Sequence, residues 1–135
     1  MESNEINPGA FDIIHVYLRG EAIADGVLRD VTEQAGREGY TSPVAVTAAA
    51  WHEAIAWDVE NGQWQDESGR LVDVLVMAKR AIRTNRERVN RLGFIVCRVR
   101  NVTGAEEPEE LSLVVSASSG DDGECVLTIM LDSED

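Results

Sequence analysis

The sequence predicts a single α+β domain, in which helices pack on a small antiparallel sheet that ends in a C-terminal β-hairpin. Residues 65–83 carry apolar side chains at helical spacing, with acidic residues at the start of this stretch and basic residues at its end, the order that the helix dipole favours. Residues 111–116 and 125–131 are apolar runs separated by Gly-Asp-Asp-Gly at 120–123, which is typical of a hairpin turn. A chain of 135 residues is long enough to bury one core without disulfides.

The part of the chain before the long helix is predicted to contain short elements. We expect residues 1–10 to form a flexible tail, residues 11–132 the domain, and residues 133–135 an acidic tail. The elements expected before residue 65 are a short strand or helical turn at 11–18, a turn at 24–26, a strand at 27–31, a helix at 32–38, an apolar segment at 44–46 and a helix at 48–57. Thr47 is a suitable N-cap for the last helix, because its hydroxyl can accept a hydrogen bond from the first turn.

The helix over residues 65–83 is expected to form the centre of the core. Its apolar stripe follows the i, i+3, i+4 spacing and consists of Leu71, Val74, Leu75, Ala78 and Ile82. Val72 and Val76 widen this stripe, which predicts that the helix is covered on more than one side. The basic stretch at 83–91 either continues the helix or frays.

Three strands are predicted in the C-terminal third. The first covers residues 94–100 and is followed by an acidic loop at 101–110 around Pro108. With the two strands of the hairpin it forms an antiparallel meander. The sequence pattern does not determine the order of the other strands in the sheet.

Acidic and basic residues are concentrated in different parts of the chain. It has 25 acidic and 12 basic residues, a formal net charge of −13. Residues 101–135 contain ten acidic residues and no basic one, whereas residues 71–100 contain eight basic residues and two acidic ones. An acidic surface repels phosphates and anionic lipid head groups, so direct binding to nucleic acid or to a membrane is disfavoured.

The acidic residues suggest one function, a non-enzymatic protein–protein interaction. The proposed contacts are Glu106, Glu107, Glu109, Glu110, Asp121, Asp122 and Glu124. Such carboxylates could imitate a row of phosphates and bind a basic host protein that normally binds nucleic acid. Trp57 and Trp64 are candidate anchors, although we expect the tryptophans to pack in the core; an exposed one would indicate a binding hot spot. The alternative interpretation is a solvated loop, turn and tail.

The basic residues suggest a second function, an accessory or regulatory protein that binds nucleic acid. The strip consists of Lys79, Arg80, Arg83, Arg86, Arg88 and Arg91. The competing interpretation is a solvated helix end that pairs with the acidic residues of the same chain, which outnumber the basic ones twofold.

No motif in the sequence indicates an enzyme, a metal site or a cofactor. The two histidines, His15 and His52, are too few for a histidine-rich metal centre. Cys97 and Cys125 form no Cys-x-x-Cys pair, and we expect both to be buried as small apolar residues. The sequence shows no secretory signal and no apolar run of the roughly 20 residues that span a membrane, so we expect a cytoplasmic protein.

Several stretches within residues 20–132 resemble a family of small acidic proteins that plasmids, phages and other mobile elements encode. The matching segments are Ala24-Asp25-Gly26-Val27-Leu28, Asp30-Val31-Thr32, Pro43-Val44-Ala45-Val46-Thr47, Gln65-Asp66-Glu67-Ser68-Gly69-Arg70-Leu71, Asp73-Val74-Leu75, Met77-Ala78, Gly120-Asp121-Asp122-Gly123-Glu124 and Leu127-Thr128-Ile129-Met130-Leu131. Tryptophan often stands in that family where this chain has Val72 and Val76. The resemblance implies no catalytic residues. It implies a setting in which small acidic proteins inhibit host restriction or CRISPR systems.

Overall fold

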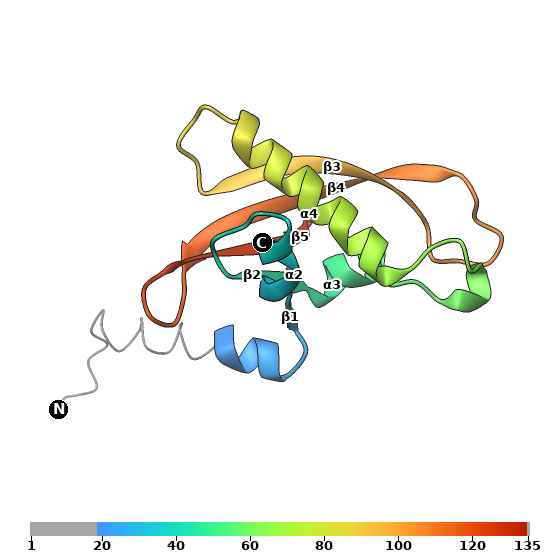
Figure 1. Cartoon of the computed structure of the whole chain (residues 1–135), viewed down its shortest axis with the longest axis horizontal. Helices are drawn as coiled ribbons and strands as arrows, with labels where there is room; N and C mark the ends of the chain where they lie inside the picture. Colours follow the sequence, from blue (N-terminus) through green and yellow to red (C-terminus); the bar gives the residue numbers. More distant parts are fainter. Residues whose placement is uncertain (1–18, 135) are drawn as a thin grey trace.

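The computed structural model describes residues 19–134, which form a five-stranded mixed sheet with helices against it (Figure 1). The strands are β1 (Leu28–Asp30), β2 (Val44–Thr47), β3 (Arg91–Val99), β4 (Pro108–Ser119) and β5 (Cys125–Leu131). The helices are α2 (Thr32–Arg37), α3 (Ala48–Ala50), the π-helix η1 (Trp51–Ile55), the 3₁₀ helix η2 (Val59–Asn61) and α4 (Glu67–Thr84). Residues 19–24 are also helical. The α+β class is confirmed; the tail predicted at 1–10 and the element predicted at 11–18 lie outside the described residues.

The sheet has the strand order β1-β2-β5-β4-β3. Strands β3, β4 and β5 form the predicted antiparallel meander. Strand β2 runs parallel to β5, with Val46 opposite Ile129, and β1 pairs antiparallel with the outer edge of β2. The predicted loop at 101–110 is too long, because β4 already begins at Pro108 and pairs Glu109 with Arg98 of β3.

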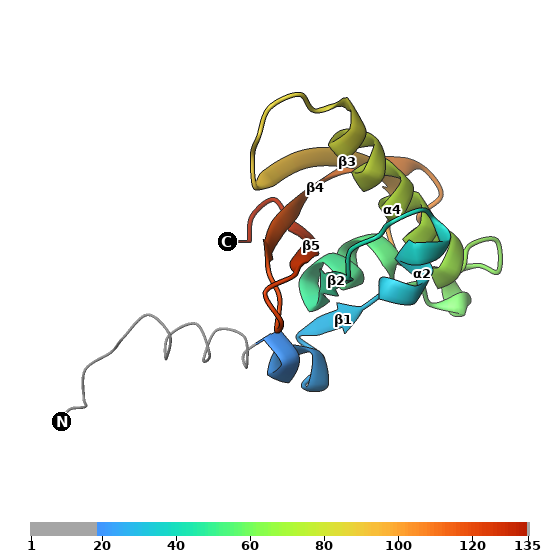
Figure 2. The same ribbon diagram turned by 60° about the vertical axis from the view of Figure 1, so that its left-hand side comes forward.

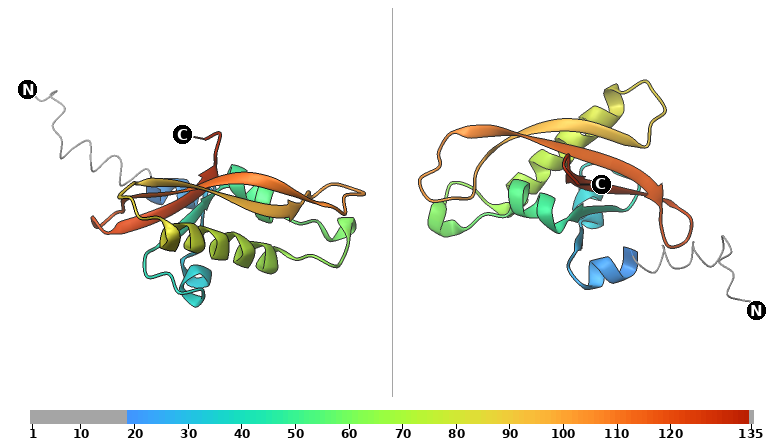
Figure 3. Two further views of the ribbon diagram at one scale, coloured as in Figure 1. Left: turned by 90° about the horizontal axis from the view of Figure 1, so that it is seen from above. Right: turned by 180° about the vertical axis from the view of Figure 1, so that it is seen from behind.

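Helix α4 lies across one face of the sheet (Figure 3). Its start is set by Asp66, whose carboxylate accepts a 2.6 Å hydrogen bond from the backbone N–H of Gly69. The helix therefore starts two residues after the predicted position, and it ends at Thr84. The basic stretch that follows does not continue the helix.

The core lies between α4, the short helices and this face of the sheet. Residues Leu71, Val74, Leu75 and Ala78 of α4 are buried, as predicted. Helix α4 contacts β3, η1 and α2, so it is covered on more than one side. The prediction that Val72, Val76 and Ile82 belong to the buried stripe is wrong, because they are 38%, 44% and 37% exposed. These three side chains lie on the part of the helix that the described elements leave partly open to solvent.

The opposite face of the sheet is also partly covered. Its buried residues are Ala45, Val114, Val126 and Thr128. Arg19 donates a 2.9 Å hydrogen bond to the Thr128 hydroxyl, so the helical segment 19–24 is attached to this face. Figure 2 shows this segment beside the β4–β5 turn. Within residues 19–134, no helix has the length and apolar character needed to cross a membrane.

Candidate functional site

The seven acidic residues predicted to bind a partner are exposed, but they lie in two separate groups. The four glutamates at 106–110 lie around the start of β4, and the acidic residues at 121–124 form the turn after its end (Figure 3). An extended strand rises about 3.3 Å per residue, and the nearest members of the two groups, Glu110 and Asp121, are separated along β4 by roughly 35 Å. They therefore do not form one continuous acidic surface.

The first group belongs to a surface built from two connected loops. The side-chain oxygen of Asn101 accepts hydrogen bonds from the backbone N–H of Asp58 at 2.9 Å and from the Asn61 amide at 2.8 Å. These bonds join the loop between β3 and β4 to the segment between η1 and α4. We call this end of the molecule the acidic end; its exposed residues are Asp58, Glu60, Trp64, Glu106, Glu107, Glu109 and Glu110.

The two candidate anchor tryptophans have different environments. Trp57 is buried, and its indole N–H donates a 2.8 Å hydrogen bond to the carbonyl of Gly62. Trp64 is 54% exposed, and its ring meets Trp57 edge-on with 5.7 Å between centroids. The prediction that the tryptophans pack in the core is thus confirmed for Trp57 and wrong for Trp64. Gly62 adopts φ +132°, and a Cβ there would collide with the Trp64 indole, so this position requires glycine.

In the second acidic group, Glu124 forms hydrogen bonds within the turn itself. The backbone N–H of Gly120 donates to the Glu124 carbonyl at 2.7 Å, and the Asp122 N–H donates to the Glu124 carboxylate at 2.9 Å. Arg19 lies close by: burial lowers its pKa, and the negative charges of Asp121, Asp30 and Glu124 oppose this effect. The turn group therefore has a cation beside it.

The last acidic residue that the structure describes, Glu134, is attached to the sheet. Its carboxylate accepts 2.8 Å hydrogen bonds from the Thr47 hydroxyl and from the Leu131 N–H. Glu134 therefore stabilises the C-terminus.

The six residues of the basic strip lie on the last turns of α4, in the segment 85–90 and at the start of β3. In the part of the chain that the structure describes, no carboxylate lies within 4.0 Å of any of them. Lys79 donates to the Glu38 carbonyl at 2.7 Å, and Arg91 donates to the Glu134 carbonyl at 2.8 Å. The other four, which are Arg80, Arg83, Arg86 and Arg88, are exposed.

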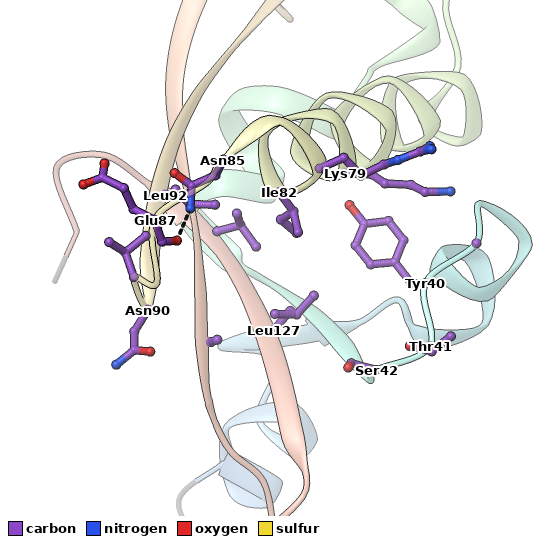
Figure 4. Close-up of a pocket in the computed structure, with 15 residues that line it drawn as sticks. Tyr40, Thr41, Ser42, Lys79, Ile82, Asn85, Glu87, Asn90, Leu92 and Leu127 are labelled. Atoms are coloured by element: carbon purple, nitrogen blue, oxygen red, sulfur yellow. Dashed lines mark hydrogen bonds between the residues drawn. The ribbon is translucent and has the colours of Figure 1, made fainter.

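A groove of about 490 Å³ lies beside the basic strip (Figure 4). Its walls are the end of α4, the segment after it, the strands β3, β4 and β5, and the loop at 39–42. Ile82, Leu92 and Leu127 contribute apolar surface, and Lys79 and Tyr40 line one side. The Tyr40 hydroxyl donates a 2.6 Å hydrogen bond to the Leu75 carbonyl. Burial raises the pKa of Tyr40 to about 12, although a hydrogen bond with the Lys79 backbone opposes this.

Comparison with known proteins identifies one family. A model of DUF6573, a family of unknown function, matches residues 5–135. The chain belongs to the DUF6573 family. No curated protein and no solved structure matches the chain.

The cysteines of this DUF6573 member are both exposed, so the prediction that they are buried is wrong. Cys97 pairs with Glu110 at one end of β4, and Cys125 pairs with Ser119 at the other end, where little packs over the sheet. The two thiols are therefore far apart. Among the described residues, no group of three or more His, Cys, Asp or Glu side chains is arranged to hold a metal ion.

The sequence-based predictions missed the most unusual side chain of the DUF6573 fold described here. Arg70 of α4 is only 4% exposed, and it lines a cavity of about 170 Å³ beside Trp64 and Glu106. A sequence signal for this position did exist. Arg70 lies four residues before Val74 and eight before Ala78, so a charged residue stands on the apolar stripe of the helix.

Proposed function

We propose that this protein is a non-enzymatic interaction protein that binds a basic partner through its acidic end. The observation that carries the proposal is the position of Trp64. Its indole is 54% exposed and lines the same cavity as Glu106. Tryptophan is the residue most enriched among the hot spots of protein interfaces, and an exposed tryptophan held against a buried ring loses little conformational entropy on binding.

The acidic residues around Trp64 supply the second part of the interaction. Glu106 and Glu107 are exposed in the loop, while Glu109 and Glu110 are held by the pairing of β4 with β3. None of these four glutamates has a Lys or Arg nitrogen within 4.0 Å among residues 19–134. Carboxylates that are not paired within the chain attract a basic surface over distance and accelerate association.

The chemistry of the partner follows from this surface. A basic groove that normally holds a phosphate backbone would accept a group of exposed carboxylates with an aromatic anchor. The resemblance to acidic proteins of mobile elements supports a partner from a host defence system that targets nucleic acid, met in the cytoplasm. The protein would then act as an inhibitor of that system by phosphate mimicry. Because the turn group lies at the opposite end of β4 from Glu109 and Glu110, we assign the contact to the acidic end alone.

A charge-reversal pair tests this assignment. The bait carries Glu106→Lys and Glu107→Lys, and the matched control carries Asp121→Lys and Asp122→Lys, which changes the net charge equally. We expect the unaltered protein and the control to retain one stoichiometric basic protein from host lysate at low salt. The acidic-end variant and Trp64→Ala should lose it. If both charge variants lost the bound protein equally, the contact would not be localised at the acidic end. Binding would then depend on the overall negative charge of the protein.

A second candidate function is supported by the basic strip. Four exposed arginines with no carboxylate within 4.0 Å among the described residues lie beside a groove, an arrangement that suits the phosphates of a nucleic acid. This function predicts salt-sensitive binding of DNA or RNA, measured by fluorescence anisotropy, that is lost in the Arg83→Ala, Arg86→Ala, Arg88→Ala variant. The acidic-end variant should bind at least as well. No measurable binding at 50 mM salt would exclude this candidate.

A further inference from the structure

The cavity beside the acidic end is lined by a buried arginine whose hydrogen bonds are incomplete. Arg70 projects from the first turns of α4 toward the end of η1 and the end of β3. Its Nε donates to the Ile55 carbonyl at 3.0 Å. Its Nη1 donates to the Val99 carbonyl at 2.9 Å and to the Gln65 side chain at 2.8 Å. Its Nη2 is buried and has no hydrogen-bond partner in the described part of the chain.

A second arginine reaches the same cavity from the neighbouring strand. Arg98 of β3 donates from Nε to the Glu53 carbonyl at 2.8 Å, and its Nη2 lies 3.6 Å from the Glu53 carboxylate. The Arg98 side chain is only 10% exposed. Its Nη1 is also buried, and none of the residues 19–134 accepts a hydrogen bond from it. Both arginines line the cavity, and the guanidinium group of each has one buried nitrogen without a hydrogen-bond partner among the described residues.

This arrangement is energetically unfavourable for folding alone. No carboxylate among the described residues lies within 4.0 Å of the Arg70 guanidinium, whose Cζ lies 5.0 Å from the centre of the Trp57 ring. Burial lowers the pKa of Arg70, and the positive charge of Arg98 lowers it further, while Asp73 and Glu67 oppose both effects. Buried unpaired donors are rare in folded proteins, and a pair of them at one cavity indicates a ligand that accepts hydrogen bonds.

The rest of the cavity limits the chemistry of that ligand. The lining is partly apolar, with contributions from Ala54, Val74, Val96, Trp64 and Pro108. Asp73 and Glu106 also line it. Two carboxylates in the wall repel a dianion such as phosphate more strongly than a monoanion. A volume of about 170 Å³ accommodates a small group only.

We infer that this cavity binds a monocarboxylate with a short apolar body, its two oxygens facing the Arg70 and Arg98 guanidinium groups and its body against Trp64 and Val96. A guanidinium fork matches the geometry of a carboxylate and forms stronger hydrogen bonds with it than with a neutral acceptor. The same chemistry is present in a free branched-chain carboxylic acid and in the C-terminal residue of a polypeptide. The inference does not rest on the proposed function, because a carboxylate would bind here whether or not the acidic end has a protein partner.

The test is an NMR titration of the full-length protein, observed through the arginine Nε–Hε signals and through Trp64. Isobutyrate, acetate and inorganic phosphate are the probes. We expect saturable shifts of the Arg70 and Arg98 signals with isobutyrate, weaker binding of acetate, and at least tenfold weaker binding of phosphate. Absence of a saturable shift with isobutyrate, or phosphate binding as tight as isobutyrate binding, would overturn the inference.

Two matched variants assign the effect to the cavity. Arg98→Gln should weaken isobutyrate binding about tenfold or more, because one charged donor pair is lost. Arg100→Gln removes the same charge from an exposed position two residues away and should leave binding within twofold. Glu106→Gln should tighten binding, since it removes a repelling carboxylate. Equal binding by the two arginine variants would show that the site lies elsewhere and would overturn the inference.

A final arm separates the two sources of the carboxylate. The dipeptide acetyl-Gly-Val with a free C-terminus is compared with its amide. Tighter binding of the free dipeptide than of isobutyrate, with no binding of the amide, assigns the cavity to a polypeptide C-terminus. Binding of isobutyrate but not of the dipeptide assigns it to a free acid. Equal binding of the dipeptide and its amide would contradict carboxylate recognition.

Discussion

The exposed ring of Trp64 meets the buried ring of Trp57 edge-on, with 76° between the two planes. The contact joins the surface of the acidic end to the core, since Trp57 also lies against the guanidinium of Arg70. One tryptophan therefore supports the fold, and its neighbour is available to a partner. Mutations at the two positions should separate stability from binding.

Trp57→Ala should lower the free energy of unfolding by about 3–5 kcal/mol, because it leaves a cavity and removes the aromatic ring next to Arg70. Trp64→Ala loses only an edge contact and should cost less than about 1 kcal/mol. Urea unfolding followed by far-UV circular dichroism measures both values. A cost for Trp64→Ala equal to that for Trp57→Ala would show that Trp64 belongs to the core and would remove the support for the proposed anchor.

The parts of the fold that follow from local pattern could be predicted from the sequence. The periodicity of residues 71–82 and the acidic residues in front of it predict α4 to within two residues at its start, and the turn at 120–123 predicts the hairpin. The parallel pairing of β2 with β5 could not be predicted, because it joins short apolar segments about 80 residues apart along the chain. Nothing in either segment specifies the other as its partner.

The candidate site was predictable only in part. Acidic residues on the loop and the turn are visible in the sequence, but their separation depends on β4 being 12 residues long. The sequence-based prediction starts this strand at residue 111, three residues too late, and therefore places Glu109 and Glu110 in the loop. The helical spacing places Arg70 on the apolar stripe, but the usual preference of arginine for solvent argues for the surface, so the sequence gives two opposing signals for its burial.

The valines of α4 test the corrected position of this helix on the sheet. Val74→Ala should lower the free energy of unfolding by about 1.5–3 kcal/mol, because its side chain is fully buried. Val72→Ala and Val76→Ala remove the same atoms from the outer face and should change stability by less than about 0.5 kcal/mol. Chemical unfolding of the three single variants gives the comparison. A large loss at Val72 or Val76 would mean that a further element or a second copy covers this face.

The hydrogen bonds of Glu134 predict that the C-terminal end stabilises the sheet. Glu134→Ala removes the acceptor for the Thr47 hydroxyl and the Leu131 N–H, and should cost about 1–2 kcal/mol. Asp132→Ala, at an exposed position two residues earlier, serves as the control and should cost less than about 0.5 kcal/mol. Thermal unfolding at equal ionic strength compares them. Equal stability of the two variants would show that the Glu134 side chain is solvated and does not stabilise the sheet.

The hydroxyl of Tyr40 predicts a loss of stability at alkaline pH. Its pKa is raised to about 12 in the folded protein, against about 10 for an unfolded chain. The contribution of the Tyr40 hydroxyl to the free energy of unfolding is therefore complete below pH 10, where the hydroxyl is protonated in both the folded and the unfolded protein. It declines as the pH rises from 10 to 12, because the unfolded chain releases the proton first.

Comparison of the Tyr40→Phe variant with the unaltered protein should reveal this pH-dependent loss of stability. At pH 7 the variant should be about 1 kcal/mol less stable, since the hydrogen bond to the Leu75 carbonyl is lost. Between pH 10 and 12 the unaltered protein should lose stability more steeply than the variant, so that the gap between them narrows. Urea unfolding at intervals of half a pH unit measures the two slopes. Parallel slopes over this range would show that the Tyr40 hydroxyl is solvated and that the wall of the groove next to α4 is open to water.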